Sequence, residues 1–209
     1  LRYAYLRDYD GAITHFDKAE EKSKSIRFRH EVFNYKFLAL LAKNDLATAE
    51  KVLTKRKDRY AGNFEKDYLR NKLLLDFLSL HFDQFMTAKN DVIKKLGIQH
   101  NLFNDYFELL TITENNYKDK PEEAQKDFAR FVKSELLLRQ GKLSESAEIL
   151  KFIANTNSAI TDEAMFRLVQ VYLQIGFPNE AEKIAGQLLK TPSKYRDSVV
   201  RLLGEYYYE

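Results

Sequence analysis

The chain has 209 residues, of which 44% are hydrophobic and 31% charged, and this balance excludes general disorder. It contains only seven glycines and three prolines, which disfavours a turn-rich β sandwich or barrel. The absence of cysteine excludes a disulfide framework, a thiolate metal site and a cysteine nucleophile. No apolar run reaches the ~18 residues that a membrane-spanning helix needs.

The net charge of +3 is unevenly distributed. Residues 51–72 hold eight basic residues and three acidic ones, the sharpest local excess in the chain. Such an excess can attract an acidic partner or nucleic acid, although a solvated helix end and loop is the simpler interpretation. The candidate basic patch consists of Lys51, Lys55, Arg56, Lys57 and Arg59.

Apolar residues recur at helical spacing from one end of the chain to the other. Residues 9, 12, 13 and 16 form one such stripe, and residues 181, 184, 185, 188 and 189 form another. No segment shows the sustained alternation of a β-strand, so no strands are expected. The pattern predicts helices near residues 1–6, 9–22, 27–42, 45–56, 63–80, 83–95, 100–114, 121–140, 143–155, 160–175, 178–190 and 193–208.

Glycine and proline fall where these helices should end or begin. Gly141 and Gly176 each follow an apolar helical run and suit the left-handed conformation that closes a helix. Pro121 and Pro178 suit first helical positions, and Ser193 suits a helix cap. Because the connections are short, consecutive helices are expected to pack as antiparallel hairpins.

The hairpins also repeat. Gly141 and Gly176 are 35 residues apart, Tyr172 precedes the second glycine by four residues, and Ala181 follows it by five. This arrangement resembles the tetratricopeptide repeat, which has an aromatic residue in the first helix, glycine at the turn and a small residue where the second helix crosses closely.

Looser units precede this one. The stripes beginning at Tyr9, Leu46 and Phe85 are spaced by 37 and 39 residues, and Asn44 and Asp83 stand near the expected glycine positions. The resemblance is strongest from about residue 120 onward. The prediction is an all-α solenoid of 11–12 helices forming a single repeat domain over residues 1–209, with divergent repeats in 1–118 and clearer ones in 119–209. Because the chain begins inside a predicted helix, we expect it to be part of a longer protein.

No pattern of residues points to catalysis. The four histidines lack metal-ligand spacing, no two glycines are close enough for a phosphate-binding loop, and no nucleophile elbow occurs. Adjacent acidic pairs such as Glu122 and Glu123 point to different helical faces, so they would not converge on one bond. The sequence therefore predicts no enzyme, no metal and no cofactor.

The resemblance implies a concave surface, lined by the first helix of each hairpin, that binds a partner peptide or helix. The groove residues that it implies are Phe131, Glu135, Leu138, Glu163, Phe166, Gln170 and Leu173. These positions lack the lysines and asparagines with which some family members grip a terminal carboxylate, so no such clamp is expected. An apolar groove with isolated polar groups suits an amphipathic segment.

Two functions from different classes follow from the resemblance. The first is a protein-interaction scaffold such as an assembly factor of the bacterial cell envelope, whose members residues 120–208 resemble. The alternative is a peptide-sensing domain of a DNA-binding regulator. A lipoprotein signal or a DNA-binding helix-turn-helix upstream of Leu1 would separate the two. Direct nucleic-acid binding is the weakest hypothesis, and the compartment and self-association stay open.

Overall fold

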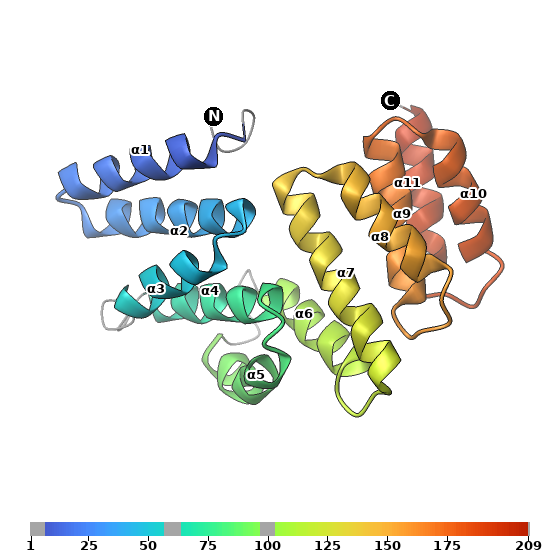
Figure 1. The fold of residues 1–209 in the computed structure, drawn as a ribbon, viewed down its shortest axis with the longest axis horizontal. Coiled ribbons are helices and arrows are strands. Elements are labelled where there is room, and N and C mark those ends of the chain that lie inside the picture. The colour runs from blue at the N-terminus through green and yellow to red at the C-terminus, as the bar shows by residue number, and fades with distance from the viewer. Residues whose placement is uncertain (1–6, 57–63, 97–102, 209) are drawn as a thin grey trace. The chain divides into compact units, whose positions relative to one another are not determined.

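The computed structural model describes residues 7–56, 64–96 and 103–208, which form eleven α-helices and no strand (Figure 1). This confirms the predicted all-α class of helical-repeat type and the number of helices. The predicted helix at 1–6 lies outside the described residues. The helices are α1 (Tyr9–Lys22), α2 (Ile26–Lys43), α3 (Leu46–Arg56), α4 (Glu65–Leu78), α5 (Phe82–Leu96), α6 (Phe103–Asn116), α7 (Glu122–Gln140), α8 (Leu143–Ala154), α9 (Thr161–Gln174), α10 (Pro178–Leu188) and α11 (Arg196–Tyr208).

One turn geometry recurs five times. In each case a residue with positive φ stands two positions before the first residue of a helix; these residues are Arg7, Asn44, Leu80, Gly141 and Gly176, with φ of 52°, 66°, 61°, 71° and 81°. At the last four turns, the backbone N–H of the next residue donates to a carbonyl five residues earlier, which caps the preceding helix. The hairpins α2–α3, α4–α5, α7–α8 and α9–α10 are therefore built alike.

The recurring turn corrects the predicted alignment of the repeats. Leu80, not Asp83, takes the position of glycine, and it lies 36 residues after Asn44. The position five residues after each turn is buried in all five cases and holds Ala12, Ala49, Phe85, Ser146 and Ala181. Phe85 is thus equivalent to Ala49, and the 39-residue spacing expected between these units was wrong. At this one position a phenylalanine replaces the small residue, and its ring packs 5.9 Å from that of Phe77.

Two predicted helix starts also differ in detail. Pro121 is the N-cap of α7, whereas Pro178 is the first residue of α10, as predicted. Helix α11 begins at Arg196, three residues later than expected. Ser193 instead accepts a hydrogen bond from the backbone nitrogen of Tyr195 in the preceding turn.

The chain forms two compact units, unit 1 (Leu1–Ile112) and unit 2 (Thr113–Glu209). Each has its own apolar core, built from the buried stripes of its hairpins. The largest fully buried side chains are phenylalanines, namely Phe33, Phe37 and Phe85 in unit 1 and Phe128 and Phe131 in unit 2. Burying a side chain of this size stabilises the fold by about 1.5–3 kcal/mol. Whether residues 1–209 act as one domain stays a prediction.

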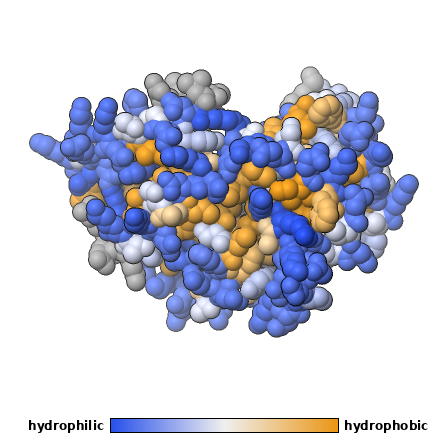
Figure 2. Space-filling view, viewed as in Figure 1, coloured by the Kyte–Doolittle hydropathy of each residue, from blue (hydrophilic) through white to orange (hydrophobic). Residues whose placement is uncertain are grey.

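The surface of both units is mostly hydrophilic in the view of Figure 2, with areas of hydrophobic residues between the charged ones. None of the described helices has the length and apolar composition required to cross a membrane.

Candidate functional site

A cluster of interacting side chains in unit 2 lies on one stripe of α9. Glu163, Phe166, Arg167 and Gln170 follow one another at helical offsets, so they share a face, which we name the α9 face. Arg167 is its centre. Its Nε lies 2.7 Å from Oε1 of Glu135 on α7, and its Nη1 donates to Oε1 of Gln170 over 2.8 Å.

The contact between Arg167 and Glu135 has the distance of a strong ion pair, but the Nε–H does not align with the carboxylate for a hydrogen bond. Both atoms are shielded from solvent, and charge alone joins them. The Arg167 side chain nevertheless remains 32% exposed. Glu135 and Gln170 therefore hold the arginine in place, and part of its side chain remains open to solvent.

Aromatic stacking connects the α9 face to the turn before α11. The ring of Phe166 stacks on that of Tyr195, with centroids 4.9 Å apart and planes only 9° from parallel. Nζ of Lys194 lies 4.8 Å from the centre of the Tyr195 ring and 3.8 Å from Oε2 of Glu163. The two partly exposed rings therefore lie beside an exposed cation.

The predicted groove residues divide into two groups. Phe131, Leu173 and Glu163 are buried, the last two at 8% exposed each, so these side chains do not line an exposed surface. Glu135, Leu138, Phe166 and Gln170 are partly exposed. Sequence reasoning missed Arg167, although its three-residue spacing from Gln170 was a signal for a side-chain pair on one face.

The residues predicted as repeat positions of unit 2 lie in the α9–α10 hairpin and at the turn before α8. Gly141 and Gly176 have the left-handed conformation, and Ala181 is fully buried. Tyr172 is partly buried, and this burial raises the pKa of its hydroxyl above the ordinary value of 10.0.

Only part of the basic patch is described. Lys51 and Lys55 are exposed on α3, and Lys57 and Arg59 lie outside the described residues. Arg56 forms an ion pair with Glu20 and covers the ring of Phe33 at 4.6 Å. Arg56 therefore holds α3 against α1 and α2, and its charge is compensated.

A buried polar network in unit 1 was not foreseen. On α2, His30 Nε2 lies 2.7 Å from Asp67 Oδ2 of α4, and Asn34 Oδ1 accepts from Nδ2 of Asn71 over 2.9 Å. Asn71 is completely buried, and its own Oδ1 accepts from Nε of Arg70. The ring of His30 also stacks 3.9 Å from that of Phe64.

The sequence did carry a signal for this network. His30 and Asn34 are four residues apart, and so are Asp67 and Asn71. The two pairs are separated by 37 residues, which is close to the repeat length in this unit. Polar residues at equivalent positions of successive first helices meet across the stack. The side chains of this network bond to one another, which is typical of polar networks that fix the register between packed helices.

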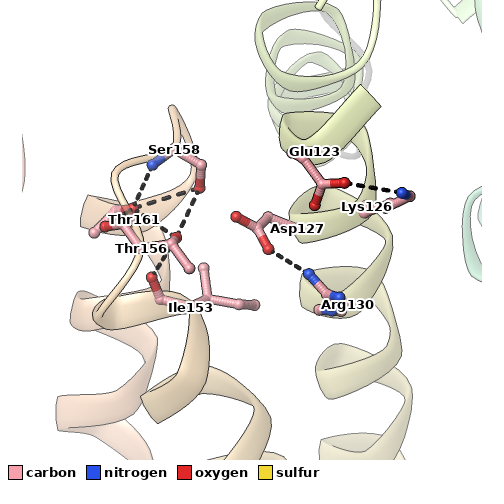
Figure 3. Close-up of polar contacts among 8 residues, drawn as sticks. All are labelled: Glu123, Lys126, Asp127, Arg130, Ile153, Thr156, Ser158 and Thr161. Carbon is pink, nitrogen blue, oxygen red and sulfur yellow. Dashed lines mark hydrogen bonds and ion pairs between the residues drawn. The ribbon is translucent and has the colours of Figure 1, made fainter. Parts of the chain in front are cut away.

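Figure 3 shows two separate groups of polar side chains, one on α7 and one at the α8–α9 connection. Asp127, nearly buried on α7, accepts from Nη1 of Arg130 over 2.7 Å. The same arginine covers the ring of Phe152 at 4.9 Å, which connects α7 to α8. Opposite Asp127 in Figure 3, the hydroxyls of Thr156, Ser158 and Thr161 bond to one another and to nearby backbone, and they stabilise the connection.

Within the described part of the chain, no group of three or more His, Asp or Glu side chains is placed to hold a metal ion. The chain matches no family model, and it has no match among curated proteins or solved structures. The geometry of its own side chains therefore carries the functional argument.

Proposed function

We propose that this chain is a non-catalytic scaffold, similar to tetratricopeptide-repeat proteins, that binds a peptide or helical segment of another protein along the α9 face. The observation that carries the proposal is Arg167, which Glu135 and Gln170 hold in a fixed orientation beside the Phe166–Tyr195 stack. Preorganised cations and rigid aromatic rings are the groups that most often supply binding energy at protein interfaces.

The partner segment should combine an apolar side chain with an acidic one. The partly exposed rings of Phe166 and Tyr195 offer apolar surface to an aliphatic or aromatic side chain, and the exposed part of Arg167 can pair with a carboxylate. Lys194, whose side chain is 73% exposed, can serve a second acidic residue. An amphipathic helix presents such groups at offsets of three and four residues, which suits it to a face built from one helical stripe.

The resemblance of residues 120–208 to envelope-associated members of the tetratricopeptide family supports a more specific setting. We place the scaffold in the assembly of the bacterial cell envelope, where it would hold another protein and require no cofactor.

Selection of a peptide library on the intact chain tests the proposal. The tightest synthetic peptide would be titrated by calorimetry against the wild type, Arg167→Gln and Phe166→Ala. We expect each substitution to weaken binding at least tenfold, because truncation of a central interface residue commonly costs more than ~1.4 kcal/mol.

Lys183→Gln provides the matched control. Lys183 is exposed on α10, the second helix of the same hairpin, so its loss should leave the affinity unchanged. Photocross-linking in the native source, from a reactive residue placed at Gln170, would then identify the natural partner. Peptides that bind the two α9-face variants as tightly as the wild type would contradict the proposed site.

A further inference from the structure

The tip of the first hairpin in unit 1 exposes an unusual mixture of side chains. Ile26 and Phe28 begin α2 and are 67% and 46% exposed, although hydrophobic residues elsewhere in unit 1 pack mostly into its core. Four basic residues surround them in the sequence. We name this set the tip patch; it consists of Lys22, Lys24, Ile26, Arg27, Phe28 and Arg29.

The charges of the tip patch are not compensated. Among the described residues none forms an ion pair with Lys22, Lys24, Arg27 or Arg29, and residues 22–29 contain no acidic residue. Glu21 and Glu31 flank the patch, while Glu20 is engaged by Arg56. The patch therefore keeps a local positive excess at its most exposed point.

The basic residues at the start of α2 are electrostatically unfavourable for this helix. The first turns of α2 and α3 contain no acidic residue, whereas α1, α4, α7 and α9 each have one there, and the first turn of α2 also includes Arg27. A cation close to the positive end of a helix is unfavourable. A local rule that a sequence breaks without a visible gain in stability commonly marks a functional surface.

The turn also holds the two apolar side chains outward. Ser23 Oγ accepts from the backbone N–H of Ser25, and Ser25 Oγ accepts from that of Phe28. These bonds fix the connection between α1 and α2. The tip lies at the end of unit 1 where α3 finishes, as the contacts of Arg56 with Glu20 and Phe33 show (Figure 1). The exposed Lys55 of α3 belongs to this same end.

From this geometry we propose that the tip patch docks unit 1 onto the surface of an anionic lipid bilayer. Lysine and arginine side chains pair with acidic headgroups, and exposed apolar side chains beside them enter the boundary between headgroups and acyl chains. Nucleic acid would satisfy the charges equally well. However, the most exposed apolar residue of the patch is the aliphatic Ile26, which offers no ring for base stacking. Only Phe28 could stack on a base, whereas both apolar side chains can enter a lipid surface, which therefore fits the charged and the apolar parts of the patch.

Sedimentation of the full chain with vesicles tests this inference. The vesicles would contain equimolar phosphatidylcholine and phosphatidylserine, or phosphatidylcholine alone. We expect binding only to the anionic vesicles, with an affinity that falls as salt is raised. Lys24→Gln with Arg27→Gln should weaken it about twenty-five-fold, because each cation near such a surface contributes about a fivefold gain in affinity.

The apolar component is tested separately. Ile26→Ser with Phe28→Ser should reduce binding about tenfold or more at unchanged net charge, because insertion depends on buried apolar area. Matched controls lie in unit 2, where Lys183→Gln with Lys190→Gln removes two exposed cations and Val200→Ser removes an exposed apolar side chain. Neither control should change vesicle binding. Circular dichroism should show the same helix content in all variants, since every substituted side chain is exposed.

Three results would overturn the inference. The first is vesicle binding that the tip-patch variants leave intact. The second is equal binding to neutral vesicles, which would remove the role of the charges. The third is salt-sensitive binding to a mixed-sequence oligonucleotide without binding to anionic vesicles, which would assign the patch to nucleic acid.

Discussion

The fully buried side-chain amide of Asn71 donates a hydrogen bond of 2.9 Å to Oδ1 of Asn34 on the neighbouring first helix. Amides in this position fix the register of α2 against α4, because any sliding of one helix along the other would leave a buried polar group without a partner.

Replacement of Asn71 should therefore destabilise unit 1. In Asn71→Leu, Asn34 Oδ1 and Arg70 Nε both lose the partner that Asn71 provides, which should lower the free energy of unfolding by about 1–3 kcal/mol. Urea denaturation followed by circular dichroism measures the change. Asn90→Leu, at an exposed position of α5, should stay within about 0.5 kcal/mol of wild type. Equal effects of the two substitutions would mean that the network contributes nothing to the free energy of unfolding.

Ala181→Leu should destabilise unit 2 by about 1–3 kcal/mol through overpacking. Ala181 is completely buried in the cluster that α9, α10 and α11 form, so the additional atoms find no space. The matched control is Ala47→Leu on α3, where the side chain is exposed. Thermal and urea unfolding would report both variants. Unchanged stability of Ala181→Leu would disprove the need for a small residue at this crossing.

Two glycine-to-alanine substitutions should act in opposite directions. Gly176 has φ of +81°, and a Cβ there would meet no atom within 4 Å, so Gly176→Ala should lose stability only through its backbone conformation, by about 1–2 kcal/mol. Gly204 lies inside α11 with equal space around it. Gly204→Ala should gain about 0.5–1 kcal/mol from helix propensity. Calorimetric unfolding of both variants measures the sign of each change in stability. A gain in stability for both variants would refute the role of Gly176 in the turn.

Stability should fall at alkaline pH, partly because of Tyr172. Burial raises the pKa of this hydroxyl, and Glu180 and Glu148 raise it further while Lys151 lowers it. The unfolded chain therefore loses the tyrosine proton before the folded chain does, so stability present below the ordinary pKa of 10.0 is lost as pH rises through the folded value.

Urea unfolding at a series of pH values above about 9 measures this dependence. Tyr172→Phe should show a smaller loss of stability across the series than the wild type, because phenylalanine has no proton to lose. Tyr208→Phe removes a hydroxyl from a side chain that is 94% exposed and should leave the dependence unchanged. Identical curves for wild type and Tyr172→Phe would rule out a contribution from Tyr172.

The helices themselves could be predicted closely from the sequence. Periodic apolar residues, together with Gly141, Gly176 and Pro178, placed most helix ends within one to three residues of those observed. This succeeded because helix formation and capping depend on residues only three to five positions apart. Ala181, which is buried, also stood out in the sequence, because a small residue five positions after a turn glycine is a local signal.

The residues that meet across the stack were decided by the tertiary structure. Leu80 takes a left-handed conformation that its side chain does not favour, so the sequence alone pointed to Asp83. Phe131 and Leu173 face the interior, and Arg167 reaches Glu135 from 32 positions away in the chain. Such contacts depend on the angle and register at which helices pack, and these are set by the fit of many side chains together. Local pattern therefore determined which segments are helical, and packing determined which of their side chains remain available to a partner.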